Sequence, residues 1–197
     1  MIGGVLLLAT VVIGLAVQPG TPFSTVLSIF GMVLFSASLV VFAFGIRGHG
    51  SVTARKPLGT AALTALAIWV LVIPTLEDLY FSRDYPSGPL LGLGDIDYFV
   101  RFATALVAVV QIARAGVVPR PWNWAPTWVL AATAAEWLIE VIAFGSLQGD
   151  QQVAAGALMS LGALVRVGGA VFLGILAIVL ANRSSGAQTV PVYRTSD

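Results

Sequence analysis

The stretch TVLSIFGMVLFSASLVVFAFGI, residues 25–46, contains no charged side chain. A helix of about 20 mostly apolar residues is long enough to cross the hydrocarbon core of a bilayer, so this stretch predicts a transmembrane helix. The whole chain has the same character, because 58% of its 197 residues are hydrophobic and only 10% are charged. Soluble domains carry roughly a quarter charged residues. We therefore expect an integral protein of the cell membrane, with lipids around most of its surface.

Five further apolar runs flank this stretch, separated by segments such as QPGTP and RGHGSVTARKP. The first run has no basic segment before it and no convincing cleavage site, so we interpret it as a membrane helix rather than a signal peptide. The prediction is an all-α, multi-pass bundle of six transmembrane helices in one domain over residues 1–182, with a short polar tail over residues 183–197. The predicted spans are Ile2–Val17, Thr25–Ile46, Leu58–Thr75, Tyr98–Val118, Thr127–Leu147 and Val153–Ala181.

The charged residues between the spans predict the orientation of the bundle. Lys and Arg are enriched in the short cytoplasmic loops of membrane proteins. Here they fall in alternate connections, whereas the loop after the third span is acidic and the loop after the fifth holds only Asp150. Both termini are therefore expected in the cytoplasm. The basic residues on that side are Arg47, Arg55, Lys56, Arg114, Arg120, Arg183 and Arg194.

Several classes of function are excluded or disfavoured by composition. The chain has no cysteine and a single histidine, His49, so disulfides, thiol nucleophiles, bis-histidine haem and the usual Cys/His metal sites are not expected. A net charge of +1 makes nucleic acid an implausible partner. The acidic outer loop holds possible oxygen ligands for a hard cation, but their spacing matches no calcium loop, and a solvated acidic loop is the stronger interpretation. Those acids are Glu77, Asp78, Asp95 and Asp97.

Four charged residues inside the apolar runs form the main candidate site. Glu136 and Glu140 lie one helical turn apart on one face of the fifth span. Arg166 lies near the middle of the sixth span and Arg101 at the outer end of the fourth. An unpaired charge at the bilayer centre costs at least about 2.5–3.5 kcal/mol. Depth in the membrane therefore predicts two intramembrane ion pairs, Glu136 with Arg166 and Glu140 with Arg101.

Smaller and uncharged residues extend this candidate site. Gly162 and Gly169 flank Arg166 and leave room for close helix approach or for a partner side chain. Gln111 and Thr133 are candidates for a wider polar interior, and Glu77 and Asp78 are secondary candidates at the outer end. Small residues four apart in the sixth span predict tight packing within the chain or against a partner; these are Gly156 with Ser160 and Ala170 with Gly174.

Three functions remain open from the residues alone. A non-catalytic accessory or structural subunit of a membrane assembly is favoured because it requires least, with the ion pairs fixing helix register. A small transporter or proton-coupled channel would instead use Glu136 and Glu140 along a hydrated path. A membrane enzyme acting on a lipid or isoprenoid substrate would use the same carboxylates as acid and base. The expected partners are membrane lipids, with a protein partner or a homo-oligomer left open; a stoichiometric protein partner would favour the first function.

Overall fold

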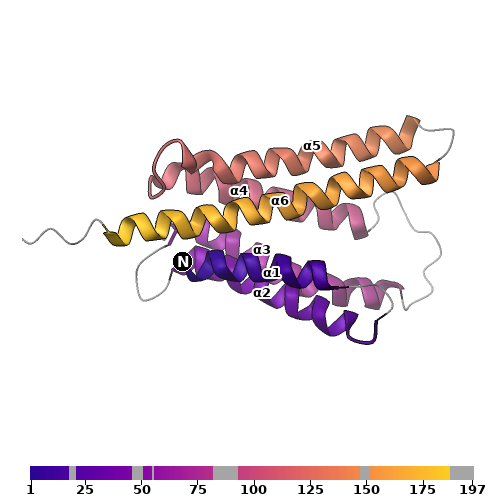
Figure 1. The fold of residues 1–197 in the computed structure, drawn as a ribbon, viewed down its shortest axis with the longest axis horizontal. Helices are drawn as coiled ribbons and strands as arrows, with labels where there is room; N and C mark the ends of the chain where they lie inside the picture. The colour runs from indigo at the N-terminus through magenta and orange to yellow at the C-terminus, as the bar shows by residue number, and fades with distance from the viewer. Residues whose placement is uncertain (18–20, 46–50, 55, 82–92, 147–150, 187–197) are drawn as a thin grey trace, which may run out of the picture.

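The computed structural model describes residues 1–17, 21–45, 51–54, 56–81, 93–146 and 151–186. All regular structure in these ranges is helical (Figure 1). A short 3-10 turn, η1, precedes the fifth helix. The elements are α1 (Ile2–Ala16), α2 (Ser24–Phe44), α3 (Pro57–Phe81), α4 (Leu93–Ala115), η1 (Trp122–Trp124), α5 (Ala125–Ser146) and α6 (Gln151–Gly186).

The predicted all-α bundle is confirmed, and each predicted span overlaps one helix. Five of the helices, α2 to α6, contain apolar segments long enough to cross a membrane. The first helix has 15 residues, which at about 1.5 Å per residue is about 22 Å, shorter than the roughly 30 Å hydrocarbon core. At the other end of the chain, α6 runs to Gly186, beyond the boundary at residue 182 expected from hydropathy.

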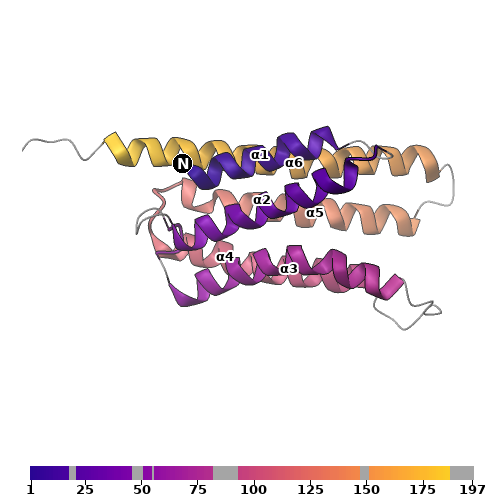
Figure 2. The same cartoon turned by 90° about the horizontal axis from the view of Figure 1, so that it is seen from below.

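The helices form a closed ring. Each helix contacts its neighbours along the chain, and α6 returns to contact α1. Figures 1 and 2 show the neighbours running antiparallel, so that the connections alternate between the two ends of the bundle. Because contacts follow this cyclic order, the six helices surround a central space instead of filling it with one of their own number.

Two glycines allow the ring to close between α1 and α6. A Cβ atom on Gly4 would lie 2.7 Å from the carbonyl oxygen of Gly174, and one on Gly174 would lie 2.8 Å from Cγ of Leu8. No side chain fits at either position, so the two backbones approach directly, as small residues permit in membrane bundles. Gly174 therefore packs within the chain. Gly156, by contrast, has no heavy atom within 4 Å of its would-be Cβ.

Apolar side chains lie both inside and outside the ring. The buried core joins α2, α3 and α4, and Ser36 satisfies its hydroxyl there by donating to the carbonyl of Ala67, 3.0 Å away. On the outside, the side chains of Phe99 and Trp128 are each 74% exposed. A surface of this kind suits an apolar solvent. The core residues are Leu39, Ala43, Ala62, Leu63, Leu66, Ala67, Val70 and Ala108.

Most of the described charges separate along the long axis of the bundle, with Arg101 and Arg166 as exceptions. The basic residues Lys56, Arg114 and Arg183 lie at the end where α2, α4 and α6 finish. Lys56 also donates from Nζ to the carbonyl of Arg114, 3.3 Å away, which satisfies an acceptor at the end of α4. The described acids, Glu77, Asp97, Glu136 and Glu140, lie in the opposite halves of their helices. His49, Arg47, Arg55, Asp150 and Arg194 are outside the described residues.

Candidate functional site

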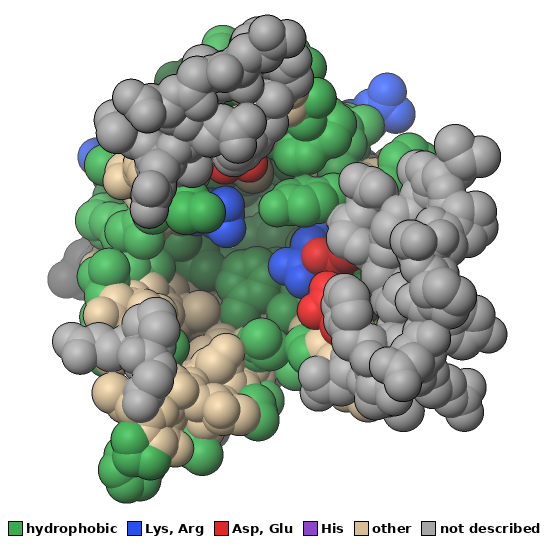
Figure 3. All heavy atoms as spheres, turned by 90° about the vertical axis from the view of Figure 1, so that its right-hand side faces the viewer, with side chains coloured by type: hydrophobic (Ala, Val, Ile, Leu, Met, Phe, Trp, Pro, Cys, Tyr) green, Lys and Arg blue, Asp and Glu red, His purple; other side chains and the backbone are tan. Residues whose placement is uncertain are grey.

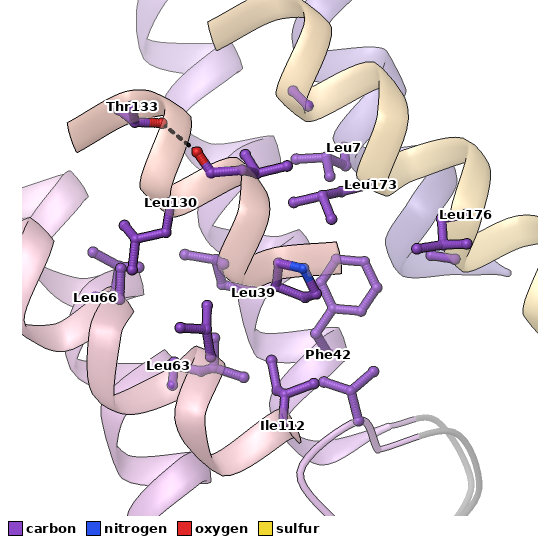
Figure 4. Close-up of a pocket in the computed structure, with 18 of the residues that line it drawn as sticks. Leu7, Leu39, Phe42, Leu63, Leu66, Ile112, Leu130, Thr133, Leu173 and Leu176 are labelled. Atoms are coloured by element: carbon purple, nitrogen blue, oxygen red, sulfur yellow. Dashed lines mark hydrogen bonds between the residues drawn. The ribbon is translucent and has the colours of Figure 1, made fainter. Parts of the chain in front are cut away.

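A chamber of about 500 Å³ lies between the helices, and all six contribute to its wall. Figure 4 shows leucines from α1, α2, α3, α5 and α6 directed into this space, together with Phe42 and Ile112. The wall is almost entirely apolar. Its prominent members are Leu7, Phe35, Leu39, Phe42, Leu63, Leu66, Val109, Ile112, Trp122, Val129, Leu130, Leu173, Leu176 and Leu180.

The chamber is open at the acidic end of the bundle. Figure 3 looks into this end and shows a hollow with hydrophobic walls, with basic and acidic side chains at its rim. The lining residues of α5 reach Thr133 and those of α6 begin at Val165 and Arg166, so these residues mark the rim on that side. Arg166 is thus the charged residue of the lining, and it lies at the end of the lining that is nearer the acidic end of the bundle.

Glu136 and Arg166 meet across α5 and α6. Arg166 Nη2 lies 3.8 Å from Glu136 Oε1, and the carboxylate side chain is 6% exposed whereas the arginine side chain is 62% exposed. Glu136 Oε1 is buried and accepts no hydrogen bond from any described residue. At this separation the charges attract without a direct hydrogen bond. The two groups thus differ in access, because only Arg166 reaches the chamber wall.

Gly162 makes room for this arrangement. A Cβ atom at position 162 would collide with Glu136 Oε1 and would lie 3.1 Å from Arg166 Nη2. The absence of a side chain on α6 lets the carboxylate rest directly against the helix backbone. Gly169, seven residues further along α6, has the same role, because a Cβ atom there would lie 2.7 Å from Cγ1 of Val129. Both glycines that flank Arg166 therefore serve the contact between α5 and α6.

The second predicted ion pair is not formed. Arg101 Nε donates to Asp97 Oδ1 at 2.7 Å, and Glu140 is not within ion-pair distance of any described basic residue. The prediction failed because α4 begins at Leu93, several residues before the predicted span. Asp97 is consequently helical and lies four residues before Arg101, a spacing that brings opposite charges together without any second helix. Glu140 lies half-buried one turn beyond Glu136.

Trp69 gives Asp97 a second partner from α3. Its Nε1 donates to Asp97 Oδ1 at 2.7 Å, so one carboxylate oxygen receives both the indole of α3 and the guanidinium of α4. The sequence analysis did not predict this contact, although the sequence places Asp97 four residues before Arg101. The contact joins α3 to α4 near the rim of the chamber.

Replacing Trp69 with phenylalanine is expected to weaken the α3–α4 contact by about 1.5–3 kcal/mol, the range for a hydrogen bond to a charged group. The variant should unfold at a lower temperature in detergent, as followed by size-exclusion chromatography after heating. Trp137→Phe is the matched control, because Trp137 is exposed on α5. Equal losses in the two variants would show that the indole hydrogen bond contributes nothing beyond ring size.

The remaining sequence candidates lie apart from Glu136. Thr133 lines the chamber, but its hydroxyl donates to the carbonyl of Val129 at 2.9 Å, as Figure 4 shows. Gln111 is half-buried on α4 toward the basic end of the bundle. Its Cβ atom lies 3.1 Å from the position that a Cβ atom on Gly59 would occupy. Glu77 is half-buried near the end of α3, and the side chain of Asp78 is outside the described residues. No three acidic or histidine side chains in the described ranges converge on a metal position.

Two buried polar atoms near the basic end were also missed. Asn123 Oδ1 and Thr127 Oγ1 have no hydrogen-bond partner among the described residues. They lie at η1 and the first turn of α5, next to the chamber-lining residues Trp122 and Pro126. No periodic pattern marks them in the sequence, because Asn123 is a single polar residue between two predicted spans and Thr127 is a single polar residue at the start of the fifth.

Comparison with known proteins identifies no relative. No family model matches the chain, no curated protein matches it, and no solved structure matches it.

Proposed function

We propose that this chain is a multi-pass protein of the cell membrane that binds a lipid-like molecule in its central chamber, as a small carrier. Five helices of membrane-spanning length and the exposed apolar surface support the membrane location. The basic end supports cytoplasmic termini, since α1 begins and α6 finishes there. In this proposal α1 also crosses, with its shorter length accommodated by local thinning of the bilayer or by tilt of its neighbours.

The chamber is the observation that carries the proposal. Its volume of about 500 Å³ falls within the roughly 300–1,000 Å³ typical of small-molecule sites. Water is a poor occupant, because a buried water needs two to four polar partners and these walls offer almost none. An apolar molecule is the occupant that the walls favour.

The enzyme alternative receives less support from the geometry. A general acid or base must come within hydrogen-bond reach of the reacting atom. Glu136 is not a lining residue of the chamber, and its Oε1 is buried against Gly162 on α6. A molecule in the chamber therefore meets the wall of the cavity and Arg166 before it meets this carboxylate.

A non-catalytic accessory subunit remains the second candidate, on a different observation. Gly156 and Ser160 are exposed, and nothing lies within 4 Å of a Cβ built on Gly156. Small residues on an outward face of a membrane helix permit close approach of another helix. The two candidates are separated by what the purified protein retains, a partner protein for the accessory subunit or a small apolar molecule for the carrier.

Filling the chamber tests the carrier proposal. A long-chain alcohol that carries a diazirine should, on illumination, label peptides that line the chamber of the wild-type protein. Ala170→Trp places a large ring at a half-buried position of the chamber wall and is expected to reduce this labelling at least about fivefold. Ala131→Trp is the control, because Ala131 is exposed on α5 and does not line the chamber. Labelling spread over lipid-facing residues, and unaffected by Ala170→Trp, would contradict the proposal.

A further inference from the structure

We propose that the molecule held in the chamber is a single-chain amphiphile with a carboxylate head, bound with that head at Arg166. This inference rests on the proposed carrier function and specifies its ligand. Arg166 is the only charged side chain among the described residues that line the chamber. An apolar molecule with one charged end therefore has one place in the cavity where that end can be recognised.

The guanidinium of Arg166 has donors to offer. A guanidinium carries five N–H donors, and that of Arg166 makes no hydrogen bond to another described residue. Its nearest acidic oxygen, Glu136 Oε1, is 3.8 Å from Nη2. The side chain is 62% exposed and forms part of the chamber wall. Donors left unused beside apolar walls are costly, and a carboxylate would satisfy two of them in a bidentate contact.

The expected sign of the head-group charge follows from which charged side chain lines the chamber. A cationic head inside the chamber would lie against Arg166, since Glu136 lies against Gly162 and does not line the cavity. Glu140 is not a lining residue either. The chamber wall therefore repels a cation and attracts an anion. Glu136 acts as a positioning residue, which holds the guanidinium at the α5–α6 seam.

A singly charged head fits better than a phosphate monoester. The guanidinium already has Glu136 3.8 Å away, with Glu140 one turn further along α5, so a monoanion adds less negative charge at this position than a dianion. A doubly charged phosphate would bring an excess of negative charge into an apolar surrounding, where desolvation of an unpaired charge is expensive. A planar carboxylate also matches the fork of the guanidinium.

The shape of the chamber points to a chain. Its lining residues on α6 run from Val165 to Leu180, which are 15 positions apart and therefore about 22 Å apart along the helix axis. Arg166 lies at one end of this run, and Ile112 and Trp122 lie toward the other. A long, apolar cavity with its single charge at one end accommodates an extended acyl or prenyl chain, whose head remains at the rim.

Four competitors with the same hydrocarbon chain test the inference. An alcohol, a carboxylate, a phosphate monoester and a trimethylammonium compound would each compete with the photoreactive alcohol for labelling of the chamber in detergent micelles. The carboxylate is expected to compete about tenfold better than the alcohol, as an added charged hydrogen-bond pair predicts. The trimethylammonium compound should compete no better than the alcohol. Preference for the phosphate or for the cation, or equal competition by all four, would overturn the inference.

Variants of Arg166 assign the effect to that residue. Arg166→Gln should bring the carboxylate down to the level of the alcohol measured on the same variant, whereas Arg166→Lys should keep part of the preference. The double variant Glu136→Gln/Arg166→Gln removes both charges and serves if the single variant fails to fold. An undiminished carboxylate preference in either neutral variant would overturn the assignment to Arg166. Failure of the photoreactive alcohol to label the chamber at all would overturn the carrier function itself, so the two failures are distinguishable.

Discussion

Gly162→Val is expected to lower the stability of the protein strongly, because position 162 has no space for any side chain. A Cβ atom there would collide with Glu136 Oε1 and crowd Arg166 Nη2, and valine adds two further methyl groups. Overpacking of this kind typically costs about 1–3 kcal/mol. Displacing the carboxylate from the guanidinium adds to that cost. We expect a marked fall in the midpoint of thermal unfolding in detergent, measured by retention of the monodisperse peak after heating.

Gly168→Val is the matched control for this variant. Gly168 lies on the same helix, and a Cβ atom built on it has no heavy atom within 4 Å. The two substitutions carry the same change in helix propensity, so the difference between them reports the contact with Glu136 alone. Similar unfolding midpoints for the two variants would mean that α6 does not press against the carboxylate of α5.

The spans could be predicted because a lipid environment requires the chain that crosses it to be helical. In lipid every backbone polar group must be satisfied within the segment, so an uncharged run such as residues 25–46 has no alternative to a helix. The same reasoning located α1 and α5 to within two residues at each end, whereas α3 runs six residues beyond its predicted end at Thr75. It failed at the start of α4, where Asp95 and Asp97 were taken as loop acids because charge was counted against a span. The helix extends beyond the predicted span there, and Asp97 has partners in Trp69 and Arg101.

The chamber could not be predicted from the sequence. Leu66 lines it, whereas Leu71 on the same helix is exposed outside the ring, and both belong to one apolar run. In a soluble helix the polar face would reveal which side is inward, but a helix with apolar solvent outside and apolar neighbours inside carries no such contrast. The return of α6 to α1 through Gly4 and Gly174 had no signal in the sequence either, since small residues also serve contacts between chains.

The proximity of Glu136 and Arg166 was more accessible to prediction. A short connection makes α5 and α6 antiparallel neighbours, and depth along each helix then selects which charges can meet. The distance of 3.8 Å and the fit of Gly162 agree with that reasoning. What depth did not reveal is the asymmetry of the pair, in which the carboxylate is buried and the guanidinium faces the chamber. That asymmetry depends on helix rotation, which composition leaves open.

Neutralising Glu136 alone is expected to be the other severe change. Glu136→Gln keeps the size of the side chain but leaves Arg166 without its nearest anion, and an unpaired arginine within a bilayer costs about 2.5–3.5 kcal/mol on the insertion scale. Exposure of the guanidinium to the open end of the chamber offsets part of this cost. Yield and thermal stability in detergent should both fall. Glu140→Gln is the control, because Glu140 lies one turn away and has no basic partner among the described residues.

The double variant decides what the pair does. Adding Arg166→Gln to Glu136→Gln should restore at least about 1 kcal/mol of the stability lost in the single variant, because the charge left without a partner is removed with it. Additive losses would show that the two charges do not interact. Restored folding without selectivity for a carboxylate would mean that the bundle is stable in the membrane without these two charges. The role of Arg166, positioned by Glu136, would then be to bind the molecule that the chamber holds.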